Sequence, residues 1–139
     1  MGEHIVVEVR VAASPERAFA AFTSAEELAL WWWPHIRDTS YAFDARPGGS
    51  YAIRSAAAGI GVEGEVVRLD APNSLELTWR WLDDGRPEPE EPVTITFAPA
   101  GEGARVIVDH RLDDSNDSGE GIREGWVSVL GRLRELLAR

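Results

Sequence analysis

The chain has 139 residues, of which 44% are hydrophobic and 27% charged, and this composition is typical of a globular domain. The length predicts one domain over residues 1–139. The net charge of −10 argues against nucleic acid and anionic membrane surfaces as partners, because both need a basic protein face. The lack of Cys excludes disulfides, and the lack of Lys excludes Schiff-base chemistry.

Membrane insertion and secretion are not expected. No apolar run approaches the roughly 20 residues that a membrane-spanning helix needs. Residues 1–11 alternate like a strand and lack the basic-then-apolar order of a signal peptide. We therefore expect the protein in the cytoplasm.

The N-terminal part predicts a strand and two short helices. Apolar and polar residues alternate over 5–11, which is typical of a half-buried strand. Ser14 followed by Pro15 predicts the start of a short helix. Ser24 and Glu27 form a capping-box pattern that opens a second helix. We expect this second helix to run into the three tryptophans that follow and to end at the next proline.

The middle of the chain predicts six strands separated by turns rich in Gly, Pro, Asn and Asp. The strands are expected around residues 41–43, 51–53, 62–69, 75–81, 93–97 and 104–112. Residues 83–92 are acidic and contain three prolines, so we expect an exposed hairpin loop there.

The last segment changes to a helical period. Apolar residues recur at positions 122, 126, 130, 133 and 137, which predicts one helix of about five turns. A sheet with one apolar face needs a cover, and this helix is the natural one. The predicted fold is α+β: a curved antiparallel sheet of about seven strands around a long C-terminal helix, plus two short helices after the first strand, with a cavity between sheet and helix.

Six tryptophans are the most unusual feature. Trp31, Trp32 and Trp33 are consecutive, and three successive side chains cannot all point the same way. Some of these rings should lie in the core, and others should meet a cavity, a partner or solvent. Together with Trp79, Trp81 and Trp126, they predict an aromatic chamber.

Several segments, in this order, resemble the START-like (SRPBCC) helix-grip superfamily, and within it the AHSA-like family named after the activator of the heat-shock-protein-90 ATPase. The matching segments are residues 12–19, 30–34, 47–51, 64–66, 75–79 and 125–126. The resemblance implies a helix-grip fold. It leaves function open, because the superfamily includes lipid carriers, cyclases and hormone receptors. The co-chaperone has an additional N-terminal domain for chaperone contacts, so we do not expect ATPase activation here.

No cofactor or metal is predicted. Residues 59–64 match the dinucleotide pattern G-x-G-x-x-G, but a strand and a turn follow where the mechanism needs a helix. A hairpin is therefore the better interpretation. His4, His35 and His110 lack the local spacing of metal ligands.

The predicted ligand-binding residues combine the aromatic chamber with two histidines. His110 lies in phase with an apolar strand face, where it could act as acid or base, anchor a ligand, or be a core histidine bonded to a Trp. His35 is expected at the cavity mouth or on an exposed loop. Alternation does not decide whether Glu63 or Glu65 faces the cavity. The full set is Trp33, His35, Tyr51, Trp79, Trp81, His110 and Trp126.

We expect a binding domain for a small hydrophobic molecule, aromatic or lipid-like. The first alternative is a cyclase- or hydrolase-type enzyme with His110 as acid or base, although no second convergent polar group stands out. The sequence leaves catalysis open and favours a role without it. The second alternative is a stress-related, co-chaperone-like interaction domain with an exposed patch around residues 31–33. The same patch could form a homodimer interface.

Overall fold

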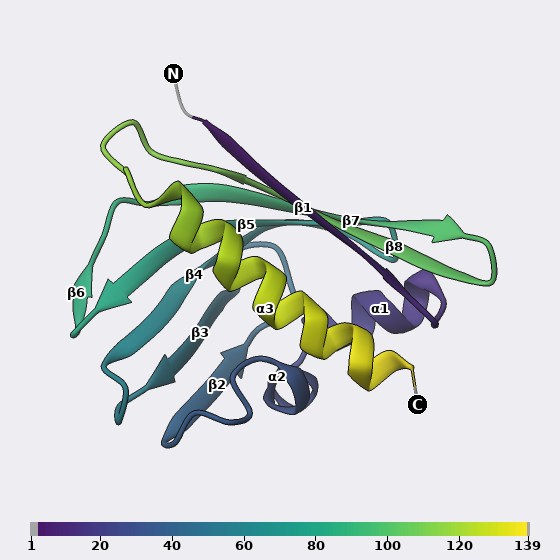
Figure 1. The fold of residues 1–139 in the computed structure, drawn as a ribbon, viewed down its shortest axis with the longest axis horizontal. Helices are drawn as coiled ribbons and strands as arrows, with labels where there is room; N and C mark the ends of the chain where they lie inside the picture. The colour runs from purple at the N-terminus through teal and green to yellow at the C-terminus, as the bar shows by residue number, and fades with distance from the viewer. Residues whose placement is uncertain (1–2, 139) are drawn as a thin grey trace.

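The computed structural model describes residues 3–138, which form a curved antiparallel sheet with a long helix across one face (Figure 1). The long helix is α3 (Gly119–Leu137), and the two short helices, α1 (Pro15–Phe22) and α2 (Ala25–Trp31), lie near its C-terminal end. The strands are β1 (His4–Val11), β2 (Thr39–Phe43), β3 (Ser50–Ser55), β4 (Ile60–Asp70), β5 (Ser74–Asp83), β6 (Arg86–Pro87), β7 (Glu91–Ala100) and β8 (Gly103–Arg111).

Seven strands form one continuous path in the order β1-β8-β7-β5-β4-β3-β2, and the short β6 pairs with the end of β5. Every pairing is antiparallel. The first strand pairs with the last along its whole length, from His4 opposite Arg111 to Val11 opposite Ala104. This α+β helix-grip architecture confirms the fold expected from the order of the predicted elements.

Residues 83–92 differ in part from the predicted exposed loop. Residues 84–90 are exposed, and β6 within them closes a hairpin against β5. Glu91, however, is only 3% exposed and begins β7. The loop prediction is therefore wrong for Glu91, because this residue continues the buried phase of the strand that follows it.

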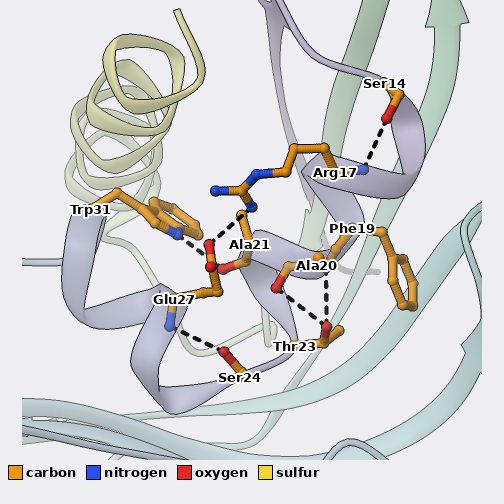
Figure 2. A network of polar contacts seen from close by, with 9 residues as sticks. All are labelled: Ser14, Arg17, Phe19, Ala20, Ala21, Thr23, Ser24, Glu27 and Trp31. Carbon is orange, nitrogen blue, oxygen red and sulfur yellow. Dashed lines mark hydrogen bonds and ion pairs between the residues drawn. The ribbon is translucent and has the colours of Figure 1, made fainter. Parts of the chain in front are cut away.

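Both short helices begin with the predicted serine caps (Figure 2). Ser14 Oγ accepts a hydrogen bond from the Arg17 amide at 3.1 Å, and Ser24 Oγ accepts one from the Glu27 amide at 3.0 Å. These bonds satisfy amides that have no partner within their helices. The Glu27 carboxylate accepts from Arg17 Nη1 at 2.9 Å, so this side chain ties α2 to α1.

Trp31 joins the two short helices from within the core. Its ring is fully buried, and its Nε1 donates to the carbonyl of Ala21 at 3.0 Å (Figure 2). The ring also packs edge-on against Phe22, with centroids 4.7 Å apart. Helix α2 ends at Trp31 rather than at Pro34 as predicted, because the backbone of Trp32 is extended (ψ 102°) and caps the helix.

The core lies between the sheet and α3. Alternate residues of the central strands are buried toward the helix, among them Leu75, Ile95 and Val108. Leu130 and Leu133 on α3 are buried against them. Burying each such side chain contributes about 1.5–3 kcal/mol, so this interface provides much of the stability of the fold.

The burial pattern along β4 shows which face of the sheet Glu63 and Glu65 occupy. Val62 and Val66 are buried, whereas Glu65 is exposed and Glu63 forms an ion pair with Arg54. Neither glutamate therefore faces the interior. The G-x-G-x-x-G pattern at residues 59–64 lies at the start of this strand. No helix follows it, as the hairpin interpretation predicts.

Candidate functional site

A cleft of about 490 Å³ opens between the first half of α3, the start of β4 and the end of β5. This volume falls within the range of small-molecule sites, about 300–1,000 Å³. Its apolar lining is dominated by five tryptophan rings, from three separate parts of the chain. These are Trp32, Trp33, Trp79, Trp81 and Trp126.

The five rings form one connected aromatic wall. Trp32 lies edge-on to Trp126, with centroids 5.3 Å apart, and 6.1 Å from Trp79. Trp79 and Trp126 are 5.1 Å apart, and Trp33 meets Trp81 almost at a right angle at 5.9 Å. Edge-on and tilted arrangements of this kind are favourable for aromatic pairs, so the rings hold one another in place.

The backbone sends the three consecutive tryptophans to different places. Trp31 ends α2 and enters the core, and Trp32 turns into the cleft wall. Trp33 has a left-handed backbone with φ 56°, which is uncommon for a bulky residue. This conformation places its half-buried ring against Trp81. Strained backbone of this kind often occurs where a side chain is positioned for a function.

Next to the aromatic wall lies a buried polar network centred on Glu91, which also lines the cleft. Glu91 Oε1 and His110 Nε2 are 2.7 Å apart, and Trp126 Nε1 donates to His110 Nδ1 at 3.0 Å. The second oxygen of Glu91 accepts from the Asp113 amide at 2.7 Å and from Asn116 Nδ2 at 2.9 Å. The network therefore joins β7, β8, α3 and the loop before α3.

The hydrogen bonds of His110 determine its charge. The indole N–H of Trp126 can only donate, so Nδ1 of His110 must accept. The ring proton then lies on Nε2, where it donates to Glu91. Burial lowers the pKa of His110 below its ordinary value, although the Glu91 carboxylate opposes this shift. We conclude that His110 is neutral.

The residues predicted as ligand-binding fall into two groups. Trp33, Trp79, Trp81 and Trp126 line the cleft. His110, Tyr51 and His35 do not: His110 is fully buried behind the wall, Tyr51 lies deeper in the core, and His35 is exposed beside Arg132.

The contacts of Tyr51 are those of a core residue. Its hydroxyl donates to the carbonyl of Thr78 at 2.7 Å, and burial raises its pKa. The ring borders a second, much smaller void of about 20 Å³, which it shares with Trp79 and Trp126.

Sequence reasoning missed several cleft residues. The sequence predicts a loop at Glu91, although its position two residues before Val93 puts it in the inward phase of the strand. Asn116 lies in a polar loop segment, and polarity alone does not distinguish a cleft residue from an exposed one. Gly121 and Gly125 line the cleft from α3, where a Cβ atom on either would meet no other atom within 4 Å. Their absence of side chains leaves room for the cleft.

Two further features of the described chain bear on the chemistry. Among residues 3–138, no three His, Cys, Asp or Glu side chains gather where they could hold a metal ion. Within the same residues, no helix has the length and apolar character needed to cross a membrane.

The sheet, the α3 cover and the aromatic cleft together define a helix-grip protein of the SRPBCC type. A family model for Activator of Hsp90 ATPase homolog 1-like proteins matches residues 12–138. The chain therefore belongs to this family, which confirms the resemblance seen in its sequence. A comparison with curated proteins found no match.

Solved structures share the fold over nearly the whole chain. Protein Mll3558 from Rhizobium loti superimposes with a TM-score of 0.83 at 21% identity, over 97% of this chain and 96% of that one. The AHSA1 protein SPO3351 from Silicibacter pomeroyi gives 0.77 at 28% identity, over 97% of both chains. DynU16, from the dynemicin biosynthetic locus, gives 0.80 at 22% identity, over 96% of this chain and 46% of that one.

Proposed function

We propose that this protein binds a small hydrophobic molecule, with an aromatic or lipid-like body, in the cleft between α3, the start of β4 and the end of β5. The observation that carries the proposal is the convergence of five tryptophan rings on an open volume of about 490 Å³. Ligand sites are typically concave and apolar, with few polar groups. The position of DynU16 in a biosynthetic locus supports a small-molecule role for this fold.

The structure offers a direct test by filling the cleft. Gly125 lines it and has open space at its Cβ position, so Gly125→Leu places a side chain in the ligand volume. Gly131 lies six residues further along α3, also has open space, and does not line the cleft. Gly131→Leu is therefore a matched control for the change in helix propensity.

A panel of naphthalene-based probes, followed by tryptophan fluorescence, provides the readout. We expect binding by the native chain, at least a tenfold loss in Gly125→Leu, and little change in Gly131→Leu. Absence of binding across the panel would refute the proposal, as would equal affinity in both variants.

The structure supports the alternative functions less well. Both ring nitrogens of His110 are occupied and the side chain has no exposed surface, so an acid–base role would require the network to open. Trp31 and Trp32 are buried, which leaves Trp33 alone of the three partly exposed for a partner or a second copy. Non-catalytic ligand binding is thus the function that the geometry favours.

A further inference from the structure

The charged side chains that line the cleft are all acidic. Its acidic side chains are Asp83 at the end of β5, Glu88 after β6 and Glu91 at the start of β7. Among the described residues that line the cleft, none is Arg or His. A ligand that enters this volume therefore meets aromatic faces and carboxylates, with no cation in the lining to pair with an acidic group.

The charge of Glu91 has no compensating cation within its hydrogen bonds. Its donors are the neutral ring of His110, the amide of Asp113 and the side-chain amide of Asn116. These three bonds hold the carboxylate in place but leave its negative charge unpaired. Glu91 is only 3% exposed, and a buried charge is costly unless a partner offsets it, so a positive group bound beside it would be stabilised.

Glu91 also stands next to the aromatic wall. It lies directly opposite Trp79 on the neighbouring strand, and both side chains are buried on the same face. Opposite residues in an antiparallel pair have Cβ atoms about 4.5–5.5 Å apart. A cation resting on the indole face of Trp79 would thus lie within reach of Glu91. Trp is the aromatic residue that attracts cations most strongly.

We infer that the cleft selects hydrophobic organic cations, that is, amines or quaternary ammonium groups on an apolar body, over neutral and anionic molecules of the same shape. The cationic head contacts the Trp79 face near Glu91, and the apolar body occupies the space between the other tryptophans and α3. This inference rests on the proposed function, and it adds the charge of the ligand.

Three probes that share a 2-naphthylmethyl body test the inference. They are (2-naphthylmethyl)trimethylammonium, its uncharged carbon isostere 2-neopentylnaphthalene, and the anion 2-naphthylacetate. Titration calorimetry at low ionic strength gives the three dissociation constants. We expect the cation to bind at least about tenfold more tightly than the isostere, and the anion to bind most weakly.

Variants locate the source of the preference. Glu91→Gln keeps the shape of the side chain and removes its charge, and Glu88→Gln removes an exposed charge at the mouth of the cleft. Glu90→Gln removes an equal charge from the same segment, outside the cleft lining, and is the matched control. We expect Glu91→Gln to weaken the cation severalfold more than the isostere, Glu88→Gln to act in the same direction less strongly, and Glu90→Gln to have little effect.

The outcomes separate this inference from the proposed function. Equal or tighter binding of the neutral isostere overturns the charge preference and leaves hydrophobic binding standing. Loss of both ligands to the same extent in Glu91→Gln, with no selective effect in Glu88→Gln, assigns the carboxylates a structural role and overturns the inference. If no probe binds the native chain, both proposals fail.

Discussion

The neighbours of His110 determine its protonation state and the position of its ring proton. The ring accepts from Trp126 and donates to Glu91, and it has no exposed surface. Buried polar groups of this kind stabilise a fold only when every donor and acceptor has a partner, which these contacts provide. Protonation of Nδ1 would set two donors against each other and would break the bond to Trp126.

This arrangement predicts a specific pH dependence of stability. The folded-state pKa of His110 lies below the unfolded value of about 6.5, so the unfolded chain takes up the proton first as the pH falls. Stability attributable to His110 should be fully present above about pH 6.5 and should fall below it, until the folded-state pKa is reached, by up to about 1.4 kcal/mol per pH unit. Urea unfolding between pH 7.5 and 5.5 measures this slope.

The control for this prediction is the exposed His35. We expect His110→Gln to flatten the slope and His35→Gln to leave it intact. A native slope that is flat over this range, or equal in His110→Gln, would contradict the assignment of a neutral buried ring.

At the scale of the elements, a glycine inside α3 lowers the stability of the helix. Gly131 lies inside the helix, and a Cβ atom there meets nothing within 4 Å. Since Gly in a helix interior costs roughly 0.5–1 kcal/mol relative to Ala, Gly131→Ala should raise the free energy of unfolding by about that amount. Chemical denaturation measures the change.

Gly64 on β4 provides the opposite case. A Cβ atom at this position would lie 2.1 Å from the carbonyl oxygen of Thr78, and backbone cannot move away easily. We expect Gly64→Ala to destabilise the protein by about 1–3 kcal/mol. A neutral Gly64→Ala would show that the approach of β4 to β5 is looser than the structure indicates.

The elements also show what a sequence can predict here. Alternation over β5 and β8 identified which side chains are buried, because each strand has one face on the core. The helical period did the same for α3. The contact between Glu91 and His110 was not predictable in this way, since it depends on the register of β7 against β8, where Val93 lies opposite His110. Likewise, the split of the tryptophan run depends on the left-handed backbone of Trp33.

At the scale of the whole molecule, the sheet and α3 bring together aromatic residues that lie far apart in the sequence. Trp32 and Trp126 are separated by most of the chain, yet their rings pack at 5.3 Å. The cleft exists because α3 presents glycines where it passes this wall, while further along it presents leucines that fill the interior. One helix thus contributes to the core along one part of its length and lines the cleft along another.

The net charge of −10 acts on the folded molecule as a whole. Like charges on a compact chain repel one another, and this repulsion is relieved when the chain unfolds. Salt screens it, because the Debye length falls to about 10 Å at 0.1 M. We therefore expect the melting temperature to rise between 10 and about 300 mM NaCl. A triple variant that removes three exposed charges, Glu102→Gln, Glu124→Gln and Glu135→Gln, should show a smaller rise. A melting temperature that falls with salt would mean that local ion pairs, such as Arg17–Glu27, outweigh the general repulsion.

The same negative field also draws cations toward the protein from a distance. The association rate of a cationic ligand should therefore decrease as salt is added, whereas that of its neutral isostere should not.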